Sequence, residues 1–261
     1  MFKVSLVSIQ SSDPMMQMAP YFLKAYFEKY TDLRPEEYSI RIHVFSLHQS
    51  PKKITQLLLD DNPAVVGFTC YVWNITKTIE ITKLIKAKAS KVMTVLGGLE
   101  VSPRANEILE TEPTVDVVVR GEGEETFKEI VEGLAAGRGL SKVAGLNFRN
   151  SKEVITNPPR PDLDYDRVPS PHLEGLITDP EDIAAPLMET MRGCSFKCHF
   201  CYYHKDFTRM RYKSLGLVEA ELKTILSKKP KRVYIADPTF NIDMRRAKKV
   251  LELFIKHNQG S

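Results

Sequence analysis

The sequence of 261 residues has no long apolar run, only one tryptophan and only four cysteines. Its longest hydrophobic stretches have the length of a strand and are broken by charged residues, so none of them could span a bilayer. Residues 1–9 are too short and too poorly flanked to be a signal peptide, and they fit a first strand better. We therefore expect a cytoplasmic protein without a membrane partner.

Low-complexity tracts and repeats of solenoid period are also missing, and 43% hydrophobic against 27% charged residues is typical of a folded core. The net charge of +4 is unevenly spread, because residues 186–261 hold 16 basic and 7 acidic side chains. A basic C-terminal part could attract nucleic acid or an anionic cofactor. We favour the simpler interpretation that its acidic counterpart is missing, and we expect no nucleic-acid partner.

Short runs rich in Val and Ile alternate with helical patterns through the first half of the chain. The expected strands are residues 3–9, 39–45, 65–70, 92–96 and 115–120. The expected helices are residues 19–30, 51–60, 75–88, 103–110 and 124–136. Five βα units in a row predict an α/β fold with a doubly wound, mostly parallel, flavodoxin-like sheet.

The rhythm changes after residue 137. Residues 146–149 and 153–156 predict a small hairpin, and residues 157–171 contain five prolines, which is typical of an extended linker. A second βα series follows, with strands at 187–191 and 232–236 and helices at 214–228 and 243–257. We therefore predict an N-terminal domain at 1–140, a hairpin and linker at 141–185, and part of a second α/β domain at 186–261.

Three of the four cysteines fall within eight residues, in a C-x3-C-x2-C arrangement formed by Cys194, Cys198 and Cys201. Such spacing lets three thiolates converge from one loop, and thiolates are the usual ligands of iron–sulfur clusters. Three ligands leave one metal position open, as in catalytic metal sites. The alternative is zinc with His199 or His204 as a fourth ligand, but no second cysteine pair exists to build an ordinary zinc knuckle.

With an aromatic residue before its last cysteine and a strand before its first, this loop resembles the signature of the radical S-adenosylmethionine (SAM) superfamily. The resemblance implies a partial (β/α) barrel and a four-iron, four-sulfur cluster in which Cys194, Cys198 and Cys201 hold three irons. The fourth iron would be chelated by SAM, whose reductive cleavage gives a 5′-deoxyadenosyl radical that abstracts a hydrogen atom. A donor such as flavodoxin or ferredoxin would supply the electron.

The same resemblance assigns roles to two further positions. The backbone at Phe200 would contact the adenine of SAM. Asp237 stands where the family often carries Gly-Gly-Glu, whose carboxylate receives the methionine amino group. The glycines are absent here, and an ordinary aspartate at a helix start is the alternative interpretation.

Unusual loops follow the predicted N-terminal strands, at the edge where open α/β sheets bind ligands. Gly121-x-Gly123 follows the fifth strand rather than the first and is flanked by glutamates, which argues against a nicotinamide dinucleotide. The loops instead resemble those of the cobalamin-binding domain that precedes many radical SAM domains. The residues that this resemblance places at cobalamin are Ser11, Tyr71, Trp73, Gly97, Gly98, Glu100, Ser102, Gly121, Glu122 and Gly123.

The leading functional hypothesis is a radical SAM enzyme with cobalamin that methylates a small molecule or peptide, or carries out a related radical reaction. No Asp-x-His-x-x-Gly motif occurs, so no histidine is evident as a lower axial ligand. A methylthiotransferase would need three more cysteines in the N-terminal domain, where only Cys70 lies. A third hypothesis is a fragment that binds cofactors or a metal without catalysis, since only the first part of a barrel is expected here.

Overall fold

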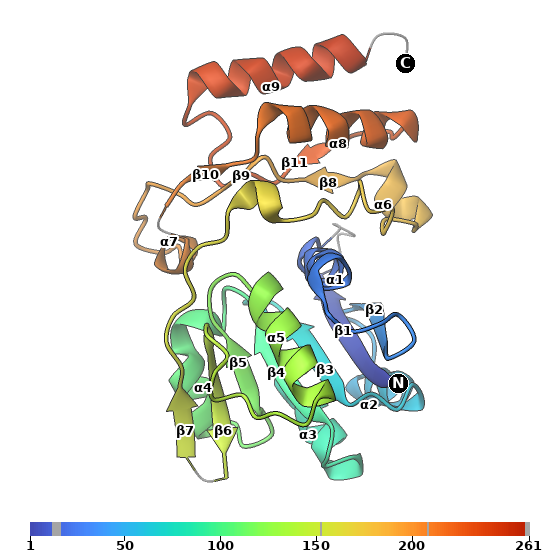
Figure 1. The fold of residues 1–261 in the computed structure, drawn as a ribbon, viewed down its shortest axis with the longest axis vertical. Coiled ribbons are helices and arrows are strands. Elements are labelled where there is room, and N and C mark those ends of the chain that lie inside the picture. Colours follow the sequence, from blue (N-terminus) through green and yellow to red (C-terminus); the bar gives the residue numbers. More distant parts are fainter. Residues whose placement is uncertain (12–16, 152, 208, 259–261) are drawn as a thin grey trace. The chain divides into compact units, whose positions relative to one another are not determined.

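The computed structural model describes residues 1–11, 17–151, 153–207 and 209–258 (Figure 1). The chain forms two compact units. The first comprises Met1–Pro14 and Tyr26–Asp162, and the second comprises Met15–Ala25 and Leu163–Ser261. Among the described residues, no helix combines the length and the apolar character that crossing a membrane requires.

The first unit is built on a seven-stranded sheet with the order β2-β1-β3-β4-β5-β6-β7. Its first five strands are parallel, which confirms the predicted doubly wound, flavodoxin-like sheet. The strands are β1 (Phe2–Gln10), β2 (Tyr38–Ser46), β3 (Val65–Thr69), β4 (Met93–Gly97), β5 (Val117–Val119), β6 (Leu146–Asn150) and β7 (Glu153–Thr156).

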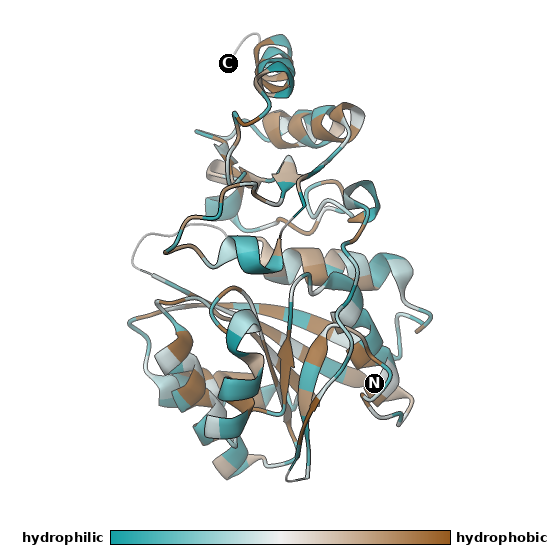
Figure 2. Cartoon of the chain, turned by 90° about the vertical axis from the view of Figure 1, so that its left-hand side faces the viewer, coloured by the Kyte–Doolittle hydropathy of each residue, from teal (hydrophilic) through white to brown (hydrophobic). Residues whose placement is uncertain are grey.

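Helices cover both faces of this sheet (Figure 1). They are α2 (Pro51–Asp60), α3 (Ile75–Lys88), α4 (Ala105–Thr111), α5 (Glu124–Ala135) and the last residues, from Tyr26, of α1 (Ala19–Tyr30), with a short 3-10 turn at Ser102–Arg104 before α4. Buried side chains of α2, α3 and α4 share one core cluster with the strands. On α1 and α5, Phe27 and Phe127 meet edge to face at 6.0 Å. Hydrophobic strands lie between helices with hydrophilic outer surfaces (Figure 2), as parallel sheets buried on both faces require.

The predicted hairpin, β6 and β7, belongs to this sheet and not to the linker. It pairs antiparallel with β5, with Val117 opposite Phe148. The reason is burial, because Leu146 and Phe148 are 0% and 8% exposed and need the sheet to cover them. The two units divide at Asp162, inside the proline-rich stretch. The domain boundaries 1–140, 141–185 and 186–261 stay a prediction.

The second unit contains one parallel βαβ crossover, formed by β8 (Leu187–Met188), α8 (Leu215–Ser227) and β11 (Tyr234–Ile235). The antiparallel pair β9 (Met191–Arg192) and β10 (Arg211–Tyr212) flanks the cysteine loop. The remaining helices are α6 (Pro180–Ala184), α7 (Tyr203–Asp206) and α9 (Met244–His257), with a 3-10 turn at Tyr165–Arg167. The crossover followed by a further helix agrees with the expected first part of a (β/α) barrel.

The strand predicted at 187–191 is broken into β8 and β9. The backbone N–H groups of Thr190 and Met191 donate to the carboxylate of Asp237, at 2.6 and 3.1 Å. Backbone donors that bond a side chain are not available to a neighbouring strand, so the ladder stops between the two segments. The carboxylate of Asp237, 46 residues after Met191, therefore ends the pairing of β8.

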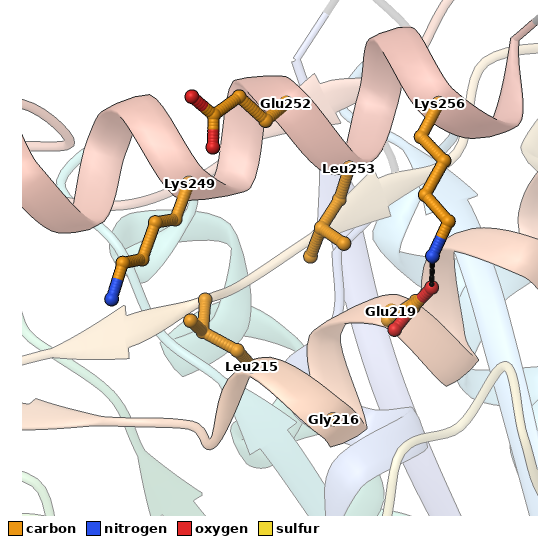
Figure 3. Close-up of a pocket in the computed structure, with 7 residues that line it drawn as sticks. All are labelled: Leu215, Gly216, Glu219, Lys249, Glu252, Leu253 and Lys256. Carbon is orange, nitrogen blue, oxygen red and sulfur yellow. Dashed lines mark hydrogen bonds and ion pairs between the residues drawn. The ribbon is translucent and has the colours of Figure 1, made fainter.

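A groove of about 350 Å³ lies between helices α8 and α9 (Figure 3). Its floor is apolar, with Leu215 and Leu253, and charged side chains form its rim. Glu219 on α8 accepts from Lys256 at 2.8 Å and from His257 at 2.7 Å, both on α9. These bonds lower the pKa of Glu219 to about 2, so the link persists through the ordinary pH range.

A buried histidine makes the stability of the second unit depend on pH. The ring of His172 is 3% exposed, and its Nε2 lies 2.9 Å from the carbonyl oxygen of Leu187, to which it donates. Burial lowers the pKa of His172 below its ordinary value of 6.5. The unfolded chain therefore binds more protons than the folded chain below pH 6.5, and stability is lost as the pH falls through that value.

We expect the urea midpoint of the second unit to decrease between pH 7.5 and pH 5.5, and the His172→Gln variant to flatten this decrease. Glutamine keeps an N–H donor for Leu187 but does not titrate. Far-UV circular dichroism would follow both units, while fluorescence of Trp73, the single tryptophan, reports on the first unit alone. Equal slopes for the variant and the unmodified protein would contradict this assignment.

Candidate functional site

The carboxyl ends of β1 and β3 mark the point where the strand order of the first unit reverses. In open α/β sheets, ligands bind at such a switch point. The loop after β3 is fixed there by Asn74, whose Nδ2 donates to the carbonyl oxygens of Thr69 at 3.0 Å and of Ile9 at 3.2 Å. Asn74 was missed from the sequence, although an asparagine between a strand and a helix is a recognisable capping signal.

Two predicted aromatic residues, Tyr71 and Trp73, form a flat stack in this loop. Their ring centroids are 4.4 Å apart and their planes differ by 8°. The indole Nε1 of Trp73 donates to the carbonyl oxygen of Ile9 at 3.4 Å, yet 44% of the residue remains exposed. The stack therefore presents an anchored aromatic surface at the switch point. Ser11, the residue immediately after β1, is exposed.

The loops after β3, β4 and β5 are joined by hydrogen bonds that involve four predicted site residues. The N–H of Cys70 donates to the carbonyl oxygen of Gly97 at 2.7 Å, and the N–H of Ser102 donates to that of Gly98 at 3.0 Å. The hydroxyl of Ser102 in turn accepts from the N–H of Gly121 at 2.9 Å. The structure thus brings Gly97, Gly98, Ser102 and Gly121 into one connected edge of the sheet.

The three remaining predicted positions of this edge have different surroundings. Glu100 pairs with Arg104 at 2.8 Å, one turn further along the chain. Glu122 is buried, at 9% exposure, and Gly123 is the residue immediately before α5. A role for any of them at cobalamin stays a prediction.

Gly98 has a backbone conformation that other residues rarely adopt, with φ at +111°. A Cβ there would lie 2.6 Å from the carbonyl oxygen of Cys70, which cannot rotate away. We expect Gly98→Ala to reduce the free energy of unfolding of the first unit by about 1–3 kcal/mol. Urea unfolding followed by Trp73 fluorescence would measure it.

Gly97→Ala is the matched control, because its Cβ would meet only the Cβ of Val119 at an ordinary 3.7 Å. We expect this variant to unfold at nearly the same urea concentration as the unmodified protein. An equal loss of stability in both variants would show that the tight approach to Cys70 is unimportant.

The cysteine loop of the second unit carries three free thiols and none of them is in a disulfide. Cys194 and Cys201 are half-buried, while Cys198 is exposed. At the start of the loop, the backbone of Gly193 packs closely against the carbonyl group of Arg209, and Gly193 has φ at +93°. The N–H of Cys194 then donates to the carbonyl oxygen of Phe207 at 3.3 Å.

The three thiols are the right donors for an iron–sulfur cluster. Within the described ranges, no group of three or more His, Cys, Asp or Glu side chains is placed to hold a metal ion. Residues 195–200 of the loop are exposed. That Cys194, Cys198 and Cys201 ligate a cluster stays a prediction. Metal sites are commonly completed only when the metal binds.

The two positions that the resemblance assigned to SAM differ in their environment. Phe200 is 88% exposed on the loop. The carboxylate of Asp237 forms hydrogen bonds within the protein. It accepts from the backbone N–H groups of Thr190 and Met191 and from the Thr190 hydroxyl. The helix-start interpretation of Asp237 is wrong, since Asp243 caps α9. Its predicted contact with SAM stays a prediction.

A threonine that the sequence did not reveal lies beside the first cysteine. The hydroxyl oxygen of Thr239 is 3.7 Å from the sulfur of Cys194. The two residues are 45 positions apart, so no local pattern could have joined them.

Known proteins that are similar to this chain include cobalamin-binding and radical SAM proteins. Residues 32–131 match the family model described as B12 binding domain. The chain is 32% identical over 200 residues to an uncharacterized methyltransferase of Pyrococcus horikoshii, a match that covers 74% of this chain and 44% of the relative. It is also 32% identical over 148 residues to the cobalamin-dependent radical SAM methyltransferase TokK of Streptomyces tokunonensis, covering 53% of this chain and 22% of the relative.

Among solved structures, the fold is similar to that of the cobalamin-dependent radical SAM enzyme OxsB, with a TM-score of 0.74 and 22% identity. This similarity covers 97% of the present chain and 37% of OxsB. The chain thus spans less than half the length of the curated relatives that it matches. Its sequence similarity places it in the family of radical SAM enzymes that carry a cobalamin-binding domain.

Proposed function

We propose that this chain supplies the cobalamin-binding and cluster-binding parts of a radical SAM enzyme that methylates a small molecule or a peptide. One observation carries the proposal. A C-x3-C-x2-C loop of three free thiols lies between β9 and β10, after β8, the first strand of a parallel βαβ crossover. A B12-binding domain on the same chain supports cobalamin as the second cofactor.

In this proposal Cys194, Cys198 and Cys201 would hold the iron–sulfur cluster through their thiolates. When bound, the reduced cluster supplies the electron that cleaves SAM, and cobalamin supplies the methyl group. The close packing of Gly193 against the backbone of Arg209 fixes the start of the loop just before Cys194, and Cys198 would contribute its thiolate from the exposed part of the loop. A small acidic electron carrier of the flavodoxin or ferredoxin class would reduce the cluster in the cytoplasm.

At the cobalamin edge, the stacked Tyr71 and Trp73 offer a flat surface for the corrin ring. The glycine-rich loops at Gly97-Gly98 and Gly121 let the backbone approach a ligand closely. Ser102 holds two of these loops in register through its bonds to Gly98 and Gly121. Phe200 is proposed to contact the adenine of SAM, as the family resemblance implies.

Anaerobic reconstitution with iron and sulfide, followed by electron paramagnetic resonance of the reduced protein, tests the cluster. We expect a four-iron signal that SAM perturbs and that a Cys198→Ala variant loses. Zinc bound by the same cysteines, with no cluster formed, would overturn the proposal. A cluster that ignores SAM would favour the hypothesis of a chain that binds a metal without catalysis.

Retention of hydroxocobalamin on desalting tests the second cofactor. We expect the unmodified protein to retain it and Trp73→Ala to retain clearly less. Tyr234→Ala is the control, because this aromatic residue is similarly exposed, at 40%, but belongs to the second unit. Equal retention by Trp73→Ala and the control would remove the aromatic stack from the cobalamin site.

The methylthiotransferase alternative needs three further cysteines in the first unit, and the sequence provides one. Cys70 is the single cysteine of the first unit and is 0% exposed. Burial raises the pKa of its thiol, which keeps it protonated and unreactive. The first unit therefore has no set of thiolates for a second cluster.

A further inference from the structure

The turn that follows β11, from Asp237 to Thr239, contacts the segment of the first cysteine at two separate points. Asp237 accepts three hydrogen bonds from Thr190 and Met191, which lie four and three residues before Cys194. Thr239 then reaches Cys194 itself, with 3.7 Å between its hydroxyl oxygen and the cysteine sulfur. Oxygen and sulfur at this separation are within hydrogen-bond reach, since sulfur has the larger radius.

This turn is held firmly on its other sides. The N–H of Ile242 donates to the carbonyl oxygen of Thr239 at 3.1 Å, and Phe240 packs against the core of the second unit. Arg246 on α9 donates to the carbonyl oxygens of Thr190 at 3.1 Å and of Lys213 at 2.6 Å. The Thr239 hydroxyl is thus kept beside Cys194 by contacts that do not involve the exposed part of the loop.

The ionisation of cysteine on metal binding fixes the direction of the Thr239 bond. A free thiol and a hydroxyl can each donate, but a thiolate ligand has no hydrogen and can only accept. We propose that Thr239 donates a hydrogen bond to the Cys194 thiolate and so tunes the reduction potential of the cluster, with Asp237 as the positioning residue that places it. This inference rests on the proposed function, because it requires that Cys194 ligates the cluster.

The expected direction of the tuning follows from charge. Reduction adds an electron to the cluster, and part of that negative charge resides on the sulfur ligands. A hydrogen bond to a ligand sulfur stabilises the reduced form and raises the potential. Loss of the donor should therefore make the cluster harder to reduce.

The test is a redox titration of the reconstituted protein, monitored by electron paramagnetic resonance, with Thr239→Val and Thr239→Ser compared. Valine has the shape of threonine without the hydroxyl, while serine keeps the donor. We expect the ratio of reduced to oxidised cluster at a fixed solution potential to fall about tenfold in Thr239→Val, which is about 59 mV for one electron. Thr239→Ser should titrate close to the unmodified protein.

Iron content, measured on every sample, distinguishes a change in the reduction potential from a failure to load the cluster. Thr239→Ala is a second variant that removes the hydroxyl donor, with a smaller side chain than valine. Potentials in Thr239→Val and Thr239→Ala equal to that of the unmodified protein would overturn the inference while leaving the cluster intact. A shift of the same size in Thr239→Ser would overturn it too. If the unmodified protein forms no cluster, the proposed function fails and this inference fails with it.

A double substitution tests the positioning role of Asp237. In Asp237→Asn, the side-chain NH2 group would face the N–H groups of Thr190 and Met191, which are donors too, so the turn should shift. We expect this shift to lower the reduction potential of the cluster, as Thr239→Val does. Since both residues act through one hydrogen bond, the shifts of Asp237→Asn and Thr239→Val should not add in the double variant. Additive shifts would show that Asp237 acts on the cluster independently of Thr239.

Discussion

Replacing Gly193 with alanine is expected to reduce iron loading of the cysteine loop to background and to destabilise the second unit by at least about 3 kcal/mol. A Cβ at this position would lie 1.9 Å from the carbonyl oxygen of Arg209 and 2.9 Å from the Cα of Met210. Both are backbone atoms, so no side-chain rotation can relieve the overlap, and φ at +93° adds strain. The pair β9 and β10, which brackets the loop, would have to separate.

Iron content after anaerobic reconstitution and urea unfolding by circular dichroism measure the two effects. Gly216→Ala is the matched control, because a Cβ there meets nothing within 4 Å and lies in the first turn of α8. Alanine in a helix is favoured over glycine, so this control should load iron fully and be slightly more stable. Trp73 fluorescence should show an unchanged first unit in both variants. Full iron loading of the Gly193→Ala variant would show that the close packing of Gly193 against Arg209 is not needed for the cysteine loop to bind iron.

Local patterns predicted the helices of the first unit closely. The expected helices at 19–30, 51–60 and 75–88 begin and end at the same residues as α1, α2 and α3. Each has apolar residues at helical spacing, and α2 also has Pro51 at its first position. The signal for these elements lies within the elements themselves, so tertiary contacts did not have to be known.

Elements that depend on distant partners could not be predicted in the same way. The break between β8 and β9 requires the carboxylate of Asp237, and the hairpin joins the sheet because β5 offers it a free edge. The candidate sites follow the same rule. The cysteine spacing and the glycine loops are local, whereas the approach of Thr239 to Cys194 and the anchor from Asn74 to Ile9 join residues far apart in the chain.

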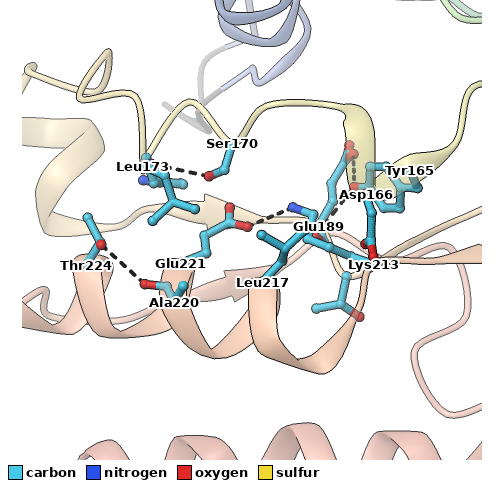
Figure 4. A network of polar contacts seen from close by, with 12 residues as sticks. Tyr165, Asp166, Ser170, Leu173, Glu189, Lys213, Leu217, Ala220, Glu221 and Thr224 are labelled. Atoms are coloured by element: carbon cyan, nitrogen blue, oxygen red, sulfur yellow. Dashed lines mark hydrogen bonds and ion pairs between the residues drawn. The ribbon is translucent and has the colours of Figure 1, made fainter.

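The buried ion pair between Lys213 and Glu221 should have the second large effect on stability. The two charged groups are 2.7 Å apart, and their side chains are 2% and 0% exposed (Figure 4). The ammonium group also lies 5.1 Å from the ring centre of Tyr165. Among the described residues, Oε1 of Glu221 has no hydrogen-bond partner, so the lysine is the main compensation for this buried carboxylate. We expect Lys213→Met to cost about 3–5 kcal/mol of unfolding free energy, because it leaves that charge unpaired.

The matched comparison is the double variant Lys213→Met/Glu221→Leu. Replacing both partners with apolar side chains of similar volume removes the desolvation penalty together with the attraction, so the double variant should regain most of the lost stability. Urea unfolding of the unmodified protein, both single variants and the double variant completes a double-mutant cycle, and the two sites should be strongly coupled. Additive losses would mean that the cost comes from poor packing around β10 and α8 rather than from an unpaired charge. If the double variant regains the stability of the unmodified protein, the ion pair between Lys213 and Glu221 is not needed for stability. Apolar side chains at these two positions would then be sufficient to pack α8 against the end of β10, the strand that follows the cysteine loop.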